Sequence, residues 1–432
     1  MQKGSRTVDS GELAVRGLDW LLAQARRTPA GGGGLSWPTR PSEREANPVL
    51  YSGAAGIVLT LLEAHQHFGA NGCAVRYAEA ALRAARALAV EPNGWELSSL
   101  HFGLTGRAVA LRAVAVLLGD TAAGTAADRA LAEARARFDG TRWAPQFDLL
   151  GGNAGIALGA LAAGDPELAL LAVTPYLRTA EPTPAGVTWE TRAGRPARLH
   201  HVAHGTLGVV QALAAVGSAT GRPELLELAR AGALDVVARA EAGPAGFLVP
   251  HSDPQDLPDR NERYSYGWCN GPTGDAEVFQ VLGAVSGETD WSALTDRCWH
   301  TVTRSGLPRR LRPGFWDNSG HCCGTAGVLA FALDRAVAGT EGAREFAGLL
   351  AADLAARATV DAAGARWSNT EHRSVPSALE PATGWAMGSA GIIRELLRHE
   401  RLVTGRDAGY AFRWPVSGGD ASSAALSPSS PR

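Results

Sequence analysis

The sequence predicts an all-α protein, an (α/α)7 toroid in which seven inner helices form a ring and seven outer helices surround it. A Gly-x-x-Gly motif recurs seven times, and apolar and amphipathic helical runs alternate between the motifs. No convincing series of strands with alternating polarity interrupts these runs. An open helical solenoid is the alternative architecture.

The seven motifs stand at near-regular intervals. They are GAAG (53–56), GLTG (103–106), GNAG (152–155), GTLG (205–208), GPTG (271–274), GTAG (324–327) and GSAG (388–391). Their first glycines are 50, 49, 53, 66, 53 and 64 residues apart. One such motif is a weak signal, but seven at this spacing indicate a repeat. Paired glycines would let the helix starts crowd together near the ring axis.

Two kinds of helix alternate along the chain. Each motif opens a run rich in Ala, Leu and Val around much of its circumference, which is typical of a buried helix. The runs between motifs carry Arg and Glu on one side, as in 75–90, 126–138, 223–241 and 291–306. Asp165 before Pro166 is a typical helix start. The segment 10–26 is expected to pair with the last inner helix and close the ring.

We expect a single domain over residues 1–416 and a disordered tail over 417–432, which is rich in Ser, Ala, Gly and Pro. Three long connections, 182–203, 242–268 and 362–387, precede inner helices and contain many prolines and glycines. We expect all three on the face where the inner helices begin. Long ordered loops in a compact fold are usually functional.

The composition restricts the function classes. The chain is 45% hydrophobic with a net charge of −2, so it can bury a large core and does not favour nucleic-acid or anionic membrane partners. Its start lacks the apolar core of a signal peptide, and no uncharged apolar run reaches the ~18 residues of a membrane span. Five cysteines are an odd number. We therefore expect a cytoplasmic protein whose clustered cysteines bind metal or catalyse.

The repeat register gathers the reactive residues. Two positions before the first glycine stand Tyr51, His101, Leu150, Ala203, Cys269, Cys322 and Ala386. One position before it stand Ser52, Phe102, Gly151, His204, Asn270, Cys323 and Met387. Equivalent positions of a ring lie at one height. The three cysteines, His204 and Asp148 (four before its glycine) are therefore expected to cluster in one mouth.

Three cysteines with an open fourth position are typical of a catalytic Zn²⁺ site. The helix N-termini around the mouth would lower thiol pKa values. Alternatives are simple packing of the cysteine pair, a vicinal disulfide, or His321 in place of Cys323 as a ligand. His101 shares the layer and is a further candidate. The remaining histidines and cysteines have weaker cases: we expect His200 and His201 at the loop or rim, Cys73 on an outer connection, and Cys298 as a buried small side chain.

Four segments, FDLLGGNAGI, AHGTLGVV, GWCNGPTG and CCGTAGVL, resemble the lanthionine synthetase C-like (LanC-like) cyclases. The resemblance spans nearly the whole chain, and its cysteine motifs are the most specific part. It implies a seven-repeat α/α toroid with zinc at its mouth. Cyclases of this family add a peptide Cys thiol to dehydroalanine or dehydrobutyrine and so form thioether rings, whereas other members add glutathione to such residues.

The resemblance implies a role for each matched residue. Cys269 corresponds to the first zinc ligand and Cys322 to the second, and Cys323 stands where most members have a His ligand. His204 matches the expected acid/base, and Asp148 matches the residue thought to assist it. Two positions depart from the family pattern: the nearest Arg before the first ligand, Arg263, lies six residues upstream, and Asn270 replaces a common Tyr or His.

We therefore expect a zinc-dependent lanthionine or methyllanthionine cyclase of a modified peptide natural product, with one Zn²⁺ per chain. Its partners would be a dehydrated precursor peptide and a separate dehydratase. The alternatives are an enzyme that adds glutathione or another external thiol, and a non-catalytic zinc-stabilised scaffold that binds peptides. A toroidal glycosidase or terpenoid cyclase would need a pair or cluster of acidic residues at the mouth. Besides Asp148, the candidate for a second acid is Glu371.

Overall fold

The computed structural model describes residues 9–28, 33–69, 72–90, 97–259, 261–309, 318–370 and 379–412. The predicted tail at 417–432 and the candidate acid Glu371 lie outside these residues.

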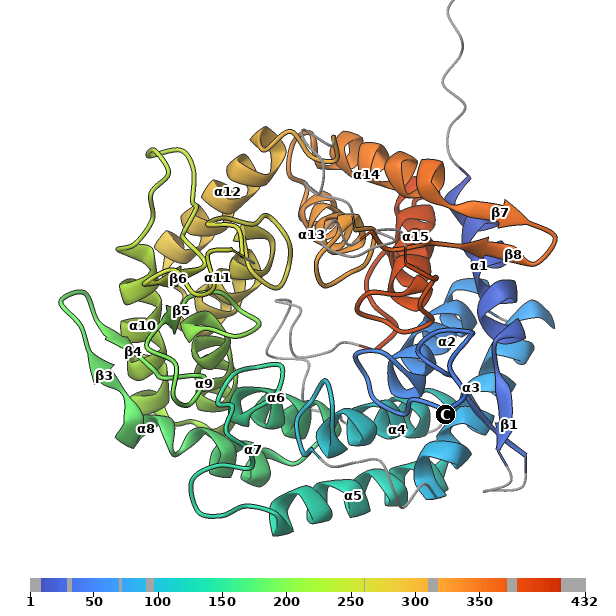
Figure 1. The fold of residues 1–432 in the computed structure, drawn as a ribbon, viewed down its shortest axis with the longest axis horizontal. Helices are drawn as coiled ribbons and strands as arrows, with labels where there is room; N and C mark the ends of the chain where they lie inside the picture. Colours follow the sequence, from blue (N-terminus) through green and yellow to red (C-terminus); the bar gives the residue numbers. More distant parts are fainter. Residues whose placement is uncertain are drawn as a thin grey trace, which may run out of the picture.

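The inner ring is closed (Figure 1). In the described chain it consists of seven helices: α2 (Ala54–Phe68), α4 (Leu104–Leu118), α6 (Asn153–Ala163), α9 (Thr206–Thr220), α11 (Pro272–Ser286), α13 (Thr325–Val337) and α15 (Ser389–Val403). Each begins directly after the first glycine of a motif. Each inner helix contacts the next, and α15 returns to α2. The predicted toroid is confirmed, and the open solenoid is excluded.

The outer helices cover the ring in order. They are α1 (Ser10–Ala23), α3 (Gly72–Val90), α5 (Thr121–Ala136), α7 (Pro166–Val173) with the short α8 (Tyr176–Thr179), α10 (Pro223–Val237), α12 (Thr289–Arg304) and α14 (Ala343–Arg357). Each from α3 onward packs against the inner helix before it, and α1 packs against α15 as predicted. Asp165 caps α7 by accepting a 2.8 Å hydrogen bond from the Leu168 N–H, with Pro166 at the first helical position.

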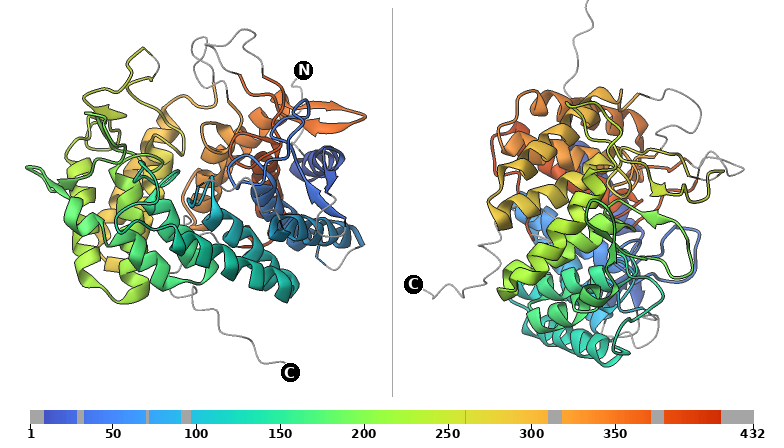
Figure 2. Two further views of the ribbon diagram at one scale, coloured as in Figure 1. Left: turned by 60° about the horizontal axis from the view of Figure 1, so that its bottom comes forward. Right: turned by 90° about the vertical axis from the view of Figure 1, so that its left-hand side faces the viewer.

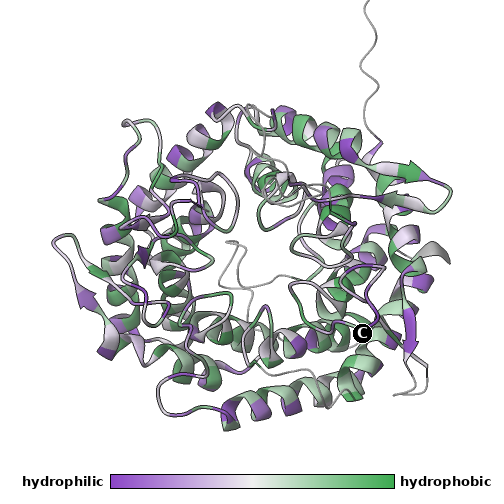
Figure 3. Ribbon diagram, in the orientation of Figure 1, coloured by the Kyte–Doolittle hydropathy of each residue, from purple (hydrophilic) through white to green (hydrophobic). Residues whose placement is uncertain are grey.

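Hydropathy distinguishes the two layers. Figure 3 shows hydrophilic and hydrophobic residues alternating along outer helices such as α5. Inner helices such as α6 and α9 are apolar over most of their length and largely buried. Among the described residues, no helix combines the length and apolar composition that crossing a membrane would need.

The connections contain short antiparallel two-stranded ribbons, which the sequence did not predict. In the described part of the chain they pair β1 (Arg26–Thr28) with β2 (Gly34–Ser36), β3 (Glu181–Pro182) with β4 (Val187–Thr188), β5 (Arg198–Leu199) with β6 (Ser252–Asp253), and β7 (Thr359–Asp361) with β8 (Gly364–Arg366). Strands of two or three residues are too short to give an alternating pattern. The β5–β6 pair ties two of the long connections together, and Figure 2 shows the connections gathered at one end of the toroid.

The second glycine of every motif is required by close packing. A Cβ at these positions would lie only 1.9–2.2 Å from the carbonyl oxygen of the residue six positions earlier. The pairs are Gly56 with Leu50, Gly106 with Leu100, Gly155 with Leu149, Gly208 with Val202, Gly274 with Trp268, Gly327 with His321, and Gly391 with Trp385. The connection before each inner helix is thereby pressed onto that helix's first turn.

Backbone hydrogen bonds join equivalent residues of neighbouring repeats. Six such bonds, each from an N–H to the next repeat's carbonyl, are seen among the described residues: Tyr51 to His101, Leu150 to Ala203, Ala203 to Cys269, Cys269 to Cys322, Cys322 to Ala386, and Ala386 to Tyr51. Their N···O distances are 2.8–3.2 Å. The last bond runs from the seventh repeat to the first. The positions aligned from sequence therefore form a physical ring, which we call the backbone ring.

Side chains below the backbone ring fill the axis. The residues three before the first glycine are all buried: Leu50, Leu100, Leu149, Val202, Trp268, His321 and Trp385. His101, from the second repeat, has its ring centroid 6.0 Å from both Trp268 of the fifth repeat and Trp385 of the seventh. These side chains meet across the axis, so the mouth has a closed floor.

Gly274→Ala is expected to lower the free energy of unfolding by about 2–3 kcal/mol, because its Cβ would overlap the Trp268 carbonyl oxygen. Chemical denaturation followed by circular dichroism would measure the change. Gly348→Ala is the matched control: this helical glycine of α14 has open space around an added Cβ, and the same substitution should stabilise by about 0.5–1 kcal/mol. Equal stabilities of the two variants would contradict the packing argument.

Candidate active site

Three cysteine sulfur atoms converge at the mouth. Cys269 directly precedes the motif of α11, and Cys322 and Cys323 directly precede that of α13. The Cys323 Sγ lies 3.1 Å from the Cys269 Sγ and 3.5 Å from the Cys322 Sγ, and all three lie within 4.8 Å of one another. Cys269 and Cys322 are buried, whereas Cys323 is partly exposed. All three are free thiols, so the structure shows no vicinal disulfide between Cys322 and Cys323.

The electrostatics of this thiol cluster favour a cation. Hydrogen bonds with Cys269 and Cys323 lower the pKa of the Cys322 thiol, and hydrogen bonding to Cys322 raises the pKa of Cys269. Three thiolates this close, two of them buried, would repel one another. Sulfur ligands around tetrahedral zinc, with Zn–S of ~2.3 Å, lie ~3.8 Å apart, so the sulfurs would separate by less than ~1 Å. The cluster therefore fits a thiolate-binding metal such as zinc.

Tyr51 belongs to the same cluster, and the sequence analysis assigned it no role. Its hydroxyl lies close enough to the Cys322 thiol to interact with it electrostatically. Burial, followed by the charge of Cys322, raises the Tyr51 pKa well above its usual range, so the hydroxyl stays a donor. The signal was available: Tyr51 holds, in the first repeat, the position that Cys269 and Cys322 hold in the fifth and sixth.

His204 and Asp148 form a hydrogen-bonded pair next to the repeat of Cys269: His204 follows Ala203, whose N–H donates to the Cys269 carbonyl at 3.1 Å. The His204 Nδ1 lies 2.7 Å from the Asp148 Oδ2, and the Gly151 N–H donates to Oδ1 at 2.7 Å. Asp148 is only 1% exposed, whereas the His204 side chain is 25% exposed. The Thr191 hydroxyl donates to the His204 backbone carbonyl at 2.6 Å. Because Nδ1 is occupied by the carboxylate, Nε2 is the ring nitrogen available to a substrate.

The other histidine candidates lie outside the thiol cluster. His200 and His201 lie in a connection, as one of the two expected placements had it, but both are only 1% exposed and therefore not at an exposed rim. His200 Nδ1 lies 2.8 Å from the Pro250 carbonyl oxygen, and His201 Nδ1 lies 2.8 Å from an Asp275 carboxylate oxygen. Both residues stand in the connection before α9, and their contacts with Pro250 and Asp275 join segments that repeat spacing does not relate.

His321 and His101 point into the axis. The His321 ring packs on Trp385 at 4.5 Å between centroids, and burial lowers the pKa of both histidines to about 3. Both therefore remain neutral at physiological pH and belong to the floor of the mouth. Cys298 is buried in α12 as predicted, and Cys73 stands in α3 rather than on a connection.

Arg263 is not at the site. Its side chain is 49% exposed, forms an ion pair with Glu241 and hydrogen-bonds with the Tyr264 hydroxyl. A different arginine, Arg192, lies beside the acid–base pair, with its Nε 3.7 Å from the Asp148 Oδ2. The sequence analysis missed Arg192, whose one signal was its place in the long connection 182–203.

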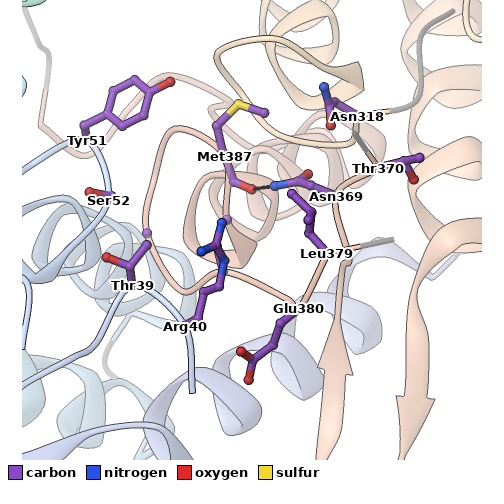
Figure 4. Close-up of a pocket in the computed structure, with 13 residues that line it drawn as sticks. Thr39, Arg40, Tyr51, Ser52, Asn318, Asn369, Thr370, Leu379, Glu380 and Met387 are labelled. Atoms are coloured by element: carbon purple, nitrogen blue, oxygen red, sulfur yellow. Dashed lines mark hydrogen bonds between the residues drawn. The ribbon is translucent and has the colours of Figure 1, made fainter. Parts of the chain in front are cut away.

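A cavity of about 280 Å³ opens beside the thiol cluster, between the first and seventh repeats (Figure 4). Tyr51 and Met387 line its end nearest the cysteines, and Arg40, Asn369 and Glu380 are among its other walls. The cavity therefore adjoins the residues that could bind a metal.

The sequence can now be compared with known proteins. Residues 44–336 match the sequence model of the family described as lanthionine synthetase C-like protein. The chain belongs to this family. The matched range includes all three site cysteines, His204 and Asp148, so the LanC-like region contains the whole candidate site.

Solved structures resemble the fold of this LanC-like protein. A nisin cyclase is 16% identical, with 86% of this chain and 92% of that chain covered and a TM-score of 0.60. An α-1,6-mannanase of Salegentibacter sp. HEL1_6 is 14% identical, with 91% and 100% covered and a TM-score of 0.49. An unsaturated glucuronyl hydrolase of Bacillus sp. GL1 is 17% identical, with 83% and 98% covered and a TM-score of 0.49. Comparison with curated protein sequences found no match.

Proposed function

We propose that this LanC-like protein is a zinc-dependent cyclase that forms lanthionine and methyllanthionine rings. It would add Cys thiols of a dehydrated precursor peptide to dehydroalanine or dehydrobutyrine residues of the same peptide. One observation carries the proposal: three thiols converge beside the His204–Asp148 pair at the mouth of a closed ring. Membership of the LanC-like family and the fold shared with a nisin cyclase support the proposal.

Cys269, Cys322 and Cys323 would hold one zinc ion per chain. Bound zinc would supply the positive charge that ionises a substrate thiol near neutral pH, where a free thiol is mostly protonated. Tyr51 would keep the Cys322 sulfur oriented through its hydroxyl donor. The open side of the site would face the mouth, where Cys323 is partly exposed.

His204 would move the proton that completes the addition. Attack of the thiolate on the β-carbon forms the C–S bond and shifts the double-bond electrons onto the carbonyl as an enolate. The α-carbon then needs a proton, which His204 Nε2 would deliver. Overall, the proton that the substrate thiol loses on ionisation balances the proton that the α-carbon gains. Asp148 would fix the imidazole orientation through Nδ1.

The substrate would come from a separate dehydratase that converts Ser and Thr of the precursor to dehydro residues. Free thiols at the mouth fit a reducing, cytoplasmic location. Addition of glutathione to the dehydrated residues uses the same chemistry, and the experiments below separate it from ring formation.

Zinc content tests the ligand assignment. Cys269→Ala, Cys322→Ala and Cys323→Ala are each expected to lose most of the roughly one zinc ion per chain, because each variant keeps only two of the three protein ligands. Mass spectrometry of the metal after gel filtration would measure it. Cys298→Ala, a buried cysteine of α12, is the control and should keep its zinc. Zinc retained by all three site variants would contradict the assignment.

His204→Ala is expected to lower kcat for cyclisation about 10²–10⁴-fold while zinc content stays unchanged, because the variant lacks the proton donor. The assay would incubate a dehydrated peptide with enzyme, with and without glutathione, and count unreacted thiols by alkylation and mass spectrometry. His300→Ala, at an exposed position, is the matched control.

Loss of alkylatable thiols without a mass increase would identify ring formation. A mass increase of one glutathione per dehydro residue would identify external thiol addition. No reaction under either condition, with zinc bound, would favour a non-catalytic scaffold and overturn the proposed cyclase.

A further inference from the structure

The cavity in Figure 4 is placed to receive substrate. Its Tyr51 and Met387 walls are tied to the cysteines through Ala386, which precedes Met387: the Ala386 N–H donates to the Tyr51 carbonyl and the Ala386 carbonyl accepts the Cys322 N–H, both at 2.8 Å. An extended peptide advances ~3.3 Å per residue. Residues that flank a peptide Cys bound at the thiol cluster can therefore reach the cavity next to it.

Asn369 is a buried acceptor in this cavity. It is 7% exposed, and its Nδ2 donates to the Met387 backbone carbonyl, which fixes the orientation of the amide. Its backbone carbonyl accepts the Leu379 N–H at 2.8 Å. The Oδ1 accepts no hydrogen bond from any described residue, and Figure 4 shows it turned away from Met387. A buried acceptor of this kind is unfavourable until a donor reaches it.

Resting on the proposed cyclase function, we propose that this cavity binds the main chain of the precursor peptide next to the reacting cysteine. Asn369 Oδ1 accepts one peptide N–H there. A main-chain donor is present at every residue, so one cavity serves cysteines in different sequence contexts. The apolar Leu379 and Met387 walls pack against whatever side chain flanks that N–H.

A coupling experiment tests this subsite. Dehydrated peptides carrying one N-methyl amide at each position around the reacting Cys would be cyclised by the parent enzyme and by Asn369→Leu. One N-methyl position is expected to raise KM about 10-fold or more in the parent and to have little effect in the variant, because both changes remove the same hydrogen bond. Asn261→Leu, an amide that donates to the Asp256 carbonyl away from the cavity, is the control.

If Asn369→Leu fails to fold, the KM values of the N-methyl peptides with the parent enzyme still test the subsite. The subsite requires that N-methylation at one peptide position raise the KM of the parent. Equal KM values for all N-methyl peptides in the parent, or equal N-methyl effects in parent and variant, would overturn it. Failure of the parent to cyclise the unmodified peptide would instead overturn the cyclase proposal.

An independent observation concerns Arg192. Its Nε approaches the Asp148 Oδ2, the same oxygen that contacts His204 Nδ1, and this Nε has no hydrogen-bond partner among the described residues. The preceding Thr191 is anchored twice: its carbonyl accepts the Phe147 N–H at 2.8 Å, and its hydroxyl bonds with the His204 carbonyl. The connection therefore holds the guanidinium beside the acid–base pair.

We infer that Arg192 is a positioning residue for proton transfer by His204. Its positive charge offsets the buried negative charge of Asp148 and holds that carboxylate in place against the imidazole. The guanidinium is 29% exposed at the side chain, so it also keeps the mouth electropositive where negative charge develops on the substrate.

Arg192→Gln is expected to lower kcat about 10-fold or more with KM within about 2-fold and zinc content unchanged. Arg192→Lys should retain more activity, and added guanidinium should partly rescue Arg192→Ala, which a purely structural defect would not show. Arg195→Gln is the matched control, since Arg195 lies in the same connection but pairs with Asp256. A parent-like kcat in Arg192→Gln, or a loss confined to KM, would overturn the assignment, whereas an inactive parent would bear only on the proposed function.

Discussion

The backbone ring is the constraint on which the rest of the structure depends. Six backbone hydrogen bonds join equivalent residues of neighbouring repeats among the described residues, and the bond from Ala386 to Tyr51 links the seventh repeat to the first. The second glycine of each motif makes this possible, because only a residue without Cβ lets the connection lie on the first helical turn. Cys269 and Cys322 are consecutive members of the ring, so their sulfurs are brought together by backbone geometry before any metal is considered.

The ring also sorts side chains by depth. Residues three before the first glycine point into the buried axis, as Trp268 and His321 do. Residues two before it form the ring itself; Tyr51 and Cys322 lie at the thiol cluster, whereas the His101 side chain joins the floor beside Trp268 and Trp385. Residues one before it, including Cys323 and His204, are partly exposed and face the mouth. This order explains why Cys323 lies in the thiol cluster while the neighbouring His321 is part of its floor.

The inner helix that closes the ring, α15, has an unusual composition. The α15 segment is rich in Arg and Glu, yet it is buried against α2 and α13. Its arginines all have acidic partners: Arg394 and Arg401 share Glu63 of α2, and Arg398 contacts Glu395 and Asp334. Buried charges are tolerated when they are paired in this way. Hydropathy alone would have placed α15 on the outside, whereas its GSAG motif placed it correctly in the inner ring.

The sequence by itself determined the helices, the closed toroid and the convergence of Cys269, Cys322, Cys323, His204 and Asp148. It could do so because a repeat converts spacing along the chain into height in the ring. Only the tertiary structure decided which residues of the irregular connections join the site: it brought Arg192 to Asp148, sent Arg263 to the surface and buried His200 and His201. Those positions depend on how each connection folds across its neighbours, through contacts between residues that share no sequence period.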